Sequence, residues 1–222
     1  MGTNLKITTG ESGYAPCATP RLTRYNALMK RGAYCLFETA LGSCGIAWTE
    51  SADGTAVVAL ALPEAACELT ERRLARVSGA QEPGAPPPRI AHIIARLRKH
   101  LAGSAQDFRD VPLDLEGADP FAQQVYAAAR KIPAGETRSY GEIANSIGQP
   151  AAAQEVGKAL ARNPIALIIP CHRVLAAGGK PGGFSAHGGL ATKATLLALE
   201  GAAFGASRSQ RSFTFPVGGA KG

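Results

Sequence analysis

Two adjacent residues, Cys171 and His172, carry the side chains that nucleophilic catalysis by cysteine requires. An ordinary thiol has a pKa of about 8.5, so only about 3% of it is thiolate at pH 7. Lowering that pKa by two units requires about 2.7 kcal/mol of thiolate stabilisation. A neighbouring imidazole can supply it, directly or through water, if a third group orients the ring. Cys171 is therefore a candidate nucleophile.

The segment before this pair should place it at the edge of the core. Five apolar residues, 165–169, lie between Pro164 and Pro170. Length alone does not distinguish strand from helix, but the flanking prolines and three isoleucines favour an extended run. Adjacent side chains of an extended chain point in opposite directions, so Cys171 and His172 can meet only through a turn or a bridging water. A buried structural cysteine beside a surface histidine is the alternative interpretation of the dipeptide alone.

The surrounding motifs resemble the O6-alkylguanine-DNA alkyltransferase family, also called methylated-DNA–protein-cysteine methyltransferases. The motifs are Asn163-Pro164, Ile-Pro-Cys-His-Arg-Val at 169–174, Gly-Phe-Ser at 183–185 and Leu-Glu-Gly at 199–201. The resemblance is dense from about residue 121 to 201 and thinner from about 33 to 114. The Pro-Cys-His-Arg-Val pentapeptide in this setting is highly specific, and it favours a reactive cysteine over a structural one.

The resemblance implies direct reversal of DNA alkylation damage. The thiolate of Cys171 would attack the alkyl carbon on O6 of a flipped guanine, and the stable thioether would inactivate the protein irreversibly. The expected partner is double-stranded DNA bearing O6-alkylguanine, with O4-alkylthymine as a further candidate substrate. No metal and no organic cofactor are implied. We expect a monomer without membrane association, located in the cytoplasm or, in a eukaryote, the nucleus.

The resemblance also implies roles for individual residues. His172 would relay the thiol proton through water, Glu200 would hold the tautomer of His172, and Asn163 would shape the active-site turn. The pocket for the flipped guanine would use the Tyr140 side chain, the Val174 carbonyl, Phe184, and Ser185 or its amide near O6. The DNA-contact positions are Ala122, Gly141, Gln149, Ala152, Ala153, Gln154, Gly157 and Ala177.

Three features depart from the family pattern. Gln154 occupies the position where the recognition helix usually carries the arginine that replaces the flipped base, and Phe184 replaces the usual tyrosine before the pocket serine. Residues 186–187 form an insertion relative to shorter members. Two rival functions remain open: a non-catalytic alkyltransferase-like protein that binds the lesion, and a cysteine hydrolase that uses Cys171 and His172. The first class lacks the cysteine, and nothing obvious supplies the second with an oxyanion pair.

Composition and charge are compatible with this class. The chain has 222 residues, 45% of them hydrophobic, and 24 basic against 17 acidic residues give a net charge of +7. That excess suits nucleic acid without proving it. Five cysteines are an odd number without metal-type spacing, which argues for free thiols in a reducing compartment. No apolar run approaches the roughly 18 residues of a membrane span, and no signal-peptide core is present.

We expect an α+β fold in which an N-terminal, ribonuclease-H-like α/β domain precedes a mainly helical helix-turn-helix (winged-helix-like) catalytic domain. The expected divisions are an irregular basic leader at 1–32, a support domain at 33–115, a DNA-binding and alkyl-acceptor domain at 119–201 and a flexible tail at 202–222. In the support domain the pattern predicts a hairpin from strands 34–39 and 45–49, a third strand at 56–62, and helices at 64–78 and 90–101. No catalytic constellation is predicted there, and Trp48 is expected in the core.

The second domain should be mainly helical. A helix is predicted from Phe121 to near Lys131, and Ser139 with Glu142 forms a capping box for a helix at 140–147. A helix at 151–161 should complete a helix-turn-helix. One edge of that helix carries only small residues, which suits either close helix packing or entry into a minor groove only about 6 Å wide.

The last predicted helix, at 190–199, should be capped by Gly201. Glu200 then lies in the last turn, where a carboxylate opposes the helix dipole by about 0.3–1 kcal/mol. Orienting His172 would explain a carboxylate at this disfavoured position, whereas free solvation is the alternative explanation.

Overall fold

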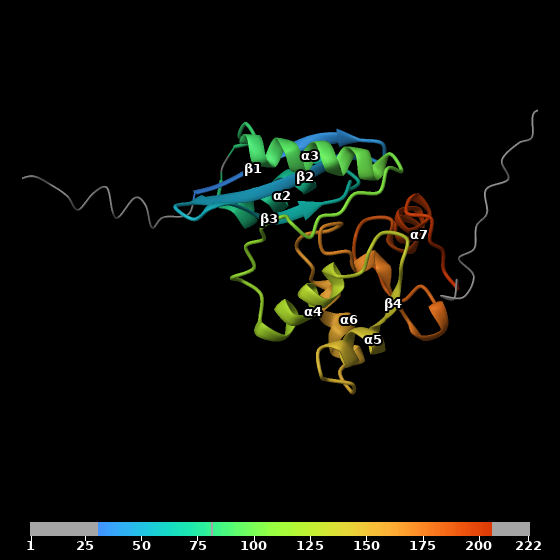
Figure 1. The fold of residues 1–222 in the computed structure, drawn as a ribbon. Coiled ribbons are helices and arrows are strands. Elements are labelled where there is room, and N and C mark those ends of the chain that lie inside the picture. Colours follow the sequence, from blue (N-terminus) through green and yellow to red (C-terminus); the bar gives the residue numbers. More distant parts are fainter. Residues whose placement is uncertain (1–30, 81, 206–222) are drawn as a thin grey trace, which may run out of the picture.

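The computed structural model describes residues 31–80 and 82–205. A three-stranded antiparallel sheet opens the fold, with β1 (Arg31–Thr39), β2 (Gly42–Ser51) and β3 (Gly54–Ala61) in that order (Figure 1). The predicted hairpin is confirmed, but its second strand begins at Gly42 and not at the predicted residue 45. The leader and the tail lie largely outside the described residues.

Two helices cover opposite faces of the sheet because strand side chains alternate between the two faces. On one face α2 (Cys67–Ser78) packs Leu74 against Tyr34, Ala47 and Ala59. On the other face α3 (Pro88–Leu101) contributes its buried residues to the main core, where Trp48 lies only 1% exposed as predicted. The prediction that the first helix begins at residue 64 is wrong, since α2 begins three residues later, at Cys67.

The helical part follows below the sheet in Figure 1. It comprises α4 (Pro120–Arg130), α5 (Tyr140–Ser146), α6 (Ala153–Ala161) and α7 (Gly189–Leu199). The short strands β4 (Arg138–Ser139) and β5 (Val174–Leu175) pair in parallel, and single 3-10 turns form at η1 (Cys171–Arg173) and η2 (Ala177–Gly179). The helix predicted to start at 151 starts at Ala153.

One hydrophobic core joins the sheet to the helices. It runs from sheet residues such as Ile46 through α3 to Val125 of α4 and Val156 of α6. The fold is therefore a mixture of helix and small sheets whose two parts share buried side chains. Among the described residues no helix has the length and apolar character needed to cross a membrane, and no cluster of His, Cys, Asp and Glu could hold a metal ion.

The capping box before α5 is formed as predicted. The Glu142 backbone N–H donates to Ser139 Oγ at 3.1 Å, and the Ser139 N–H donates to Glu142 Oε2 at 2.7 Å. Two backbone donors at the start of the helix are therefore satisfied by side chains. This cap fixes the start of α5, where Tyr140 is the first helical residue.

We expect Ser139→Ala to lower the free energy of unfolding by about 1 kcal/mol, because the helix loses its N-cap acceptor. Urea unfolding at neutral pH measures this change. Ser146→Ala, at the other end of the same helix, is the matched control and should change stability by less than about 0.5 kcal/mol. Equal losses for the two variants would contradict the capping role.

Candidate active site

The segment before the thiol is a buried turn. Only Ile165 makes a strand-like bridge, to Leu60 of β3, and the Ile169 N–H donates to the Ile165 carbonyl at 2.9 Å. Leu167 has a φ of 65°, a value that an extended residue does not take. The prediction of an extended run at 165–169 is therefore wrong, although the burial it inferred is correct.

Asn163 holds this turn closed. Its Nδ2 donates to the Ile169 carbonyl at 2.8 Å, and its Oδ1 accepts from the Ile165 N–H at 2.9 Å. The side chain thus ties both ends of the turn to one amide, in a position only 9% exposed. The geometry agrees with the role of shaping the turn that the sequence suggested for Asn163.

Cys171 and His172 leave the turn as part of η1, a 3-10 turn. The Arg173 N–H donates to the Pro170 carbonyl at 3.0 Å, so the backbone bends directly after the proline. Burial raises the pKa of the Cys171 thiol above its ordinary value, although the Asn163 side chain, the charge of Lys193 and two backbone N–H groups act in the opposite direction. The pKa of the resting thiol is therefore raised, not lowered as a nucleophilic cysteine was expected to require, and the site by itself keeps the thiol protonated.

His172 follows the thiol in the chain and is 1% exposed. Its Nε2 lies 3.0 Å from Glu200 Oε1. An ionised carboxylate can only accept, so Nε2 carries the proton and Nδ1 is the unprotonated nitrogen. Nδ1 is buried and has no protein hydrogen-bond partner within the described residues. The ring therefore offers one basic nitrogen on the side that does not face Glu200.

Glu200 is the C-cap residue of α7, and its carboxylate accepts four hydrogen bonds. Oε1 accepts from His172 Nε2, from His100 Nε2 at 2.9 Å and from the Arg173 guanidinium at 2.7 Å. Oε2 accepts from Arg173 Nε at 2.9 Å. The expectation that Glu200 contacts His172 is confirmed, and these partners explain why a carboxylate is stable at a helix C-terminus.

These contacts set the protonation states of the group. Burial alone would raise the pKa of the Glu200 carboxyl, but hydrogen bonds from His100, His172 and Arg173 outweigh it and hold the pKa far below its ordinary range. Burial also lowers the pKa of the His172 imidazole despite the opposing effect of Glu200. Glu200 is therefore ionised and His172 neutral near pH 7.

Two residues of this site were missed by the sequence analysis. His100 comes from α3, in the part where no catalytic constellation was predicted. Lys193 of α7 is fully buried, and its Nζ donates to the Val174 carbonyl at 2.7 Å and to the Gly183 carbonyl at 3.3 Å. Burial lowers the pKa of the Lys193 ammonium to about 8. The only sequence signal for Lys193 was an ionisable residue placed among apolar positions of its helix.

A pocket of about 550 Å³ opens beside the thiol. Its walls come from α5, α6 and the loop after η2, and they include Tyr140, Gln154, Gly157, Cys171, Phe184 and Ser185. The loop packs closely on Tyr140, because a Cβ at Gly182, where φ is +61°, would lie 2.8 Å from Tyr140 Oη. The structure thus brings the predicted thiol, pocket residues and helix edge to one cavity.

A smaller pocket, of about 210 Å³, is also lined by Cys171. It shares Phe184 and Ser185 with the first pocket and is lined further by the inserted residues Ala186 and His187 and by β3. The inserted residues therefore line a cavity that Cys171 and β3 also line.

The predicted DNA-contact residues differ in exposure. Gln149, Gln154 and Ala177 are exposed, and Gly141, Ala152, Ala153 and Gly157 are partly exposed. Ala122 is 3% exposed, and its N–H donates to Asp119 Oδ1 at 2.8 Å, so its side chain belongs to the core at the start of α4. A DNA contact at Ala122 stays a prediction. The Val174 carbonyl, predicted to face guanine, already accepts from Lys193.

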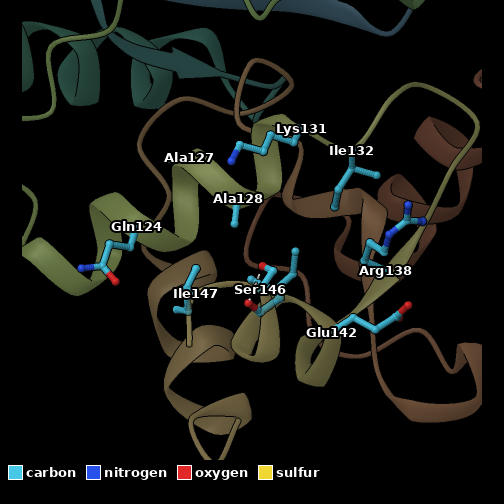
Figure 2. A pocket seen from close by; sticks show the side chains of 10 residues that line it. Gln124, Ala127, Ala128, Lys131, Ile132, Arg138, Glu142, Ser146 and Ile147 are labelled. Carbon is cyan, nitrogen blue, oxygen red and sulfur yellow. Dashed lines mark hydrogen bonds between the residues drawn. The ribbon is translucent and has the colours of Figure 1, made fainter. Parts of the chain in front are cut away.

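A further pocket, of about 430 Å³, lies between α4 and α5 (Figure 2). Its lining includes Lys131, Arg138 and Glu142 around apolar residues such as Ile147. It contains neither a thiol nor an imidazole, so it cannot provide the nucleophile and base found at Cys171. The cavities at Cys171 are therefore the candidate active site.

Comparisons with known proteins agree with this site. Residues 120–202 match the family model described as "6-O-methylguanine DNA methyltransferase, DNA binding domain". The chain is 50% identical over 114 residues to the methylated-DNA–protein-cysteine methyltransferase of Mycolicibacterium paratuberculosis, an alignment that covers 51% of this chain and 67% of that protein. Over 106 residues it is 50% identical to the protein of the same name from Methanosarcina acetivorans, covering 48% and 65% respectively.

Solved structures give the same result. The structure of Mycobacterium tuberculosis OGT in complex with DNA matches with a TM-score of 0.60 and 37% identity, covering 76% of this chain and 92% of that one. The O6-methylguanine-DNA methyltransferase of Pyrococcus kodakaraensis matches with a TM-score of 0.58 at 21% identity, covering 77% and 99%. At that identity the second likeness concerns the fold alone.

We expect Glu200→Gln to lower the free energy of unfolding by about 3–5 kcal/mol at pH 7, because the buried Arg173 charge loses its partner. The depressed pKa of Glu200 adds stability that is complete above its ordinary value of 4.5 and declines as the pH falls below it. The difference in free energy of unfolding between wild type and Glu200→Gln should therefore be smaller at pH 3.5 than at pH 7. Urea unfolding at the two pH values measures it.

Glu155→Gln on α6 is the control for this experiment, since its side chain is 52% exposed. It should change stability by less than about 0.5 kcal/mol at either pH. A Glu200→Gln deficit of the same size at pH 7 and pH 3.5 would show that the carboxylate charge does not provide the stabilisation.

Proposed function

This chain belongs to the methylated-DNA–protein-cysteine methyltransferase family, and from that premise we propose that Cys171 is the acceptor through which it repairs alkylated DNA. DNA is its partner, and alkyl transfer is its reaction. The observation that supports Cys171 most strongly is its position. The residue borders the 550 Å³ pocket and precedes a buried imidazole whose Nδ1 has no protein partner among the described residues.

The proposed reaction is an in-line displacement. A bond forms between Sγ of Cys171 and the alkyl carbon while the bond between that carbon and O6 of guanine breaks. The thiol proton passes through water to Nδ1 of His172, and the electron pair of the broken bond stays on the guanine. The imidazolium then returns its proton through water to N1, which restores guanine and neutral His172. Because the pKa of the resting thiol is raised, proton transfer accompanies the arrival of the lesion. The thioether is stable, so each protein molecule acts once.

The proposed substrate is O6-alkylguanine in double-stranded DNA, and the protein acts as a monomer. The lesion lies inside the base stack, so the nucleotide is flipped into the pocket at a cost of a few kcal/mol. Tyr140, Phe184 and Ser185 line that pocket and are the proposed contacts of the base. The small, partly exposed edge of α6 is the proposed surface that enters the minor groove.

We also propose a fold for each of the two parts of the chain. We assign residues 33–115 to a ribonuclease-H-like support domain and residues 119–201 to a winged-helix-like catalytic domain. The sheet with α2 and α3 on its two faces supports the first assignment, and α5 followed by α6 supports the second. The divisions do not imply independence, because one core passes through both parts.

We expect incubation with an O6-methylguanine duplex to add one methyl group to the protein, as measured by intact mass, and peptide mapping to place it on Cys171. Cys171→Ser should take up no methyl and still bind the duplex, because α6 is untouched. Cys67→Ser is the matched control, since Cys67 is an exposed free thiol, and it should react like wild type.

The same measurement separates the alternatives. A lesion-binding protein would gain no mass, and a cysteine hydrolase would keep no lasting adduct. A methyl group mapped to Cys17, Cys35, Cys44 or Cys67 would contradict the assignment of Cys171.

Gln154 should limit how well the lesion is extruded from a duplex. Its side chain is exposed on α6 and lines the pocket that Cys171 borders. An amide can pair with an orphaned base edge, but it is shorter than arginine and carries no charge. We therefore expect Gln154→Arg to raise the single-turnover rate on duplex DNA and Gln154→Ala to lower it. The arginine should also steepen the salt dependence of binding by up to about one unit.

Single-stranded substrate is the internal control, because its base needs no extrusion from a pair. On single-stranded DNA the single-turnover rates of wild type, Gln154→Arg and Gln154→Ala should differ less than on the duplex. Equal single-turnover rates on the duplex for wild type and both variants would show that residue 154 does not enter the base stack.

A further inference from the structure

We propose that His100 is a positioning residue for the alkyl-transfer reaction, supplied to the active-site carboxylate by the part of the chain that contains the sheet. The inference rests on the proposed function, in which His172 accepts the proton of Cys171. Its basis is one contact, 2.9 Å between His100 Nε2 and Glu200 Oε1. The two side chains are 3% and 1% exposed.

The ring of His100 is fixed on several sides. The Gln106 N–H donates to its Nδ1 at 3.1 Å, and the ring meets Phe108 edge to face with centroids 5.5 Å apart. Because Nδ1 accepts a hydrogen bond, the proton of the neutral ring lies on Nε2. His100 is therefore held in one orientation and one tautomer, in which its Nε2–H donates to Glu200.

The Glu200 carboxylate needs such a donor if it is to hold the His172 ring in one orientation. Its backbone ends α7, where no further helical turn restrains it, and Arg173 clamps it from the same short turn that carries His172. Arg173 and His172 therefore shift together with the thiol. His100 is the donor that reaches Oε1 from a different element, α3, so it fixes the carboxylate relative to the rest of the core.

The consequence concerns the Nδ1 atom of His172. That atom points correctly only if Nε2 remains directed at Oε1. Without His100, Glu200 can rotate about its side-chain bonds and follow Arg173, and the imidazole loses its fixed direction. We therefore expect loss of the His100 side chain to slow proton removal from Cys171. DNA binding should be unchanged, because His100 is buried and contacts Glu200, Gln106 and Phe108, none of which belongs to α6. The N-terminal part thus contributes to the chemistry as well as to support.

Two amide variants of the full chain test this inference. In His100→Gln the side-chain amide reaches the position of Nε2 and can still donate to Glu200. In His100→Asn it reaches only the position of Nδ1, so it can bond the Gln106 N–H but not the carboxylate. The variants differ by one methylene group and have the same polarity. His100→Leu, which lacks both polar atoms, is a second variant that breaks the contact.

Three measurements are made on each protein after melting curves have shown which are folded. They are the single-turnover methyl-transfer rate at saturating duplex, the duplex dissociation constant, and the rate at which iodoacetamide alkylates Cys171. We expect His100→Asn and His100→Leu to lower both rates about tenfold, by analogy with the loss of a hydrogen-bond partner that orients a metal-bound histidine. His100→Gln should stay within about twofold of wild type, and all should bind DNA equally.

Leu97→Ala is the control for simple destabilisation, because Leu97 is fully buried on the same helix. It should lower the melting temperature and leave both rates unchanged in the folded protein. Wild-type rates in His100→Asn and His100→Leu, or equal losses in His100→Gln and His100→Asn, would overturn the inference. If wild type itself transferred no methyl group, the proposed function would fail, whereas the iodoacetamide rates would still decide the role of His100.

Discussion

The site depends on one buried oxygen atom, Oε1 of Glu200, which accepts hydrogen bonds from His100, His172 and Arg173. A carboxylate in this position is costly without partners, because it is removed from water and lies at the negative end of α7. Its three donors come from α3 and from the turn that carries the thiol. Satisfying that one charge therefore requires the sheet part, the active-site turn and the last helix to be assembled together.

In the resting site the thiol of Cys171 and the imidazole of His172 are neutral, whereas Glu200 and Lys193 beside them are charged. Burial raises the pKa of the Cys171 thiol and lowers that of the His172 imidazole, so neither group is ionised near pH 7. Glu200 stays negative, and Lys193, with a pKa of about 8, remains mostly positive close to the thiol. In the proposed reaction this thiol loses its proton when the substrate is in place.

The sequence predicted the parts of this arrangement that have local signals. The motif around Cys171 indicated the nucleophile, and the helix end indicated Glu200, because each lies in a short pattern with its own physical reason. His100 had no such signal, since it is 100 residues from Glu200 and fits the basic flank of an amphipathic helix. The segment 165–169 was misjudged because apolar composition predicts burial but not the backbone, and Leu167 takes a positive φ there.

The central claim is that Glu200 holds His172 with its proton on Nε2 and with Nδ1 free to accept the thiol proton. Nitrogen-15 NMR of the histidine-labelled protein at pH 7 measures the tautomer of each ring directly. We predict the Nε2–H tautomer for His172, and the same tautomer for His100, in the unalkylated protein. A His172 resonance pattern with the proton on Nδ1 would contradict the account, because the ring could then not act as the base for Cys171.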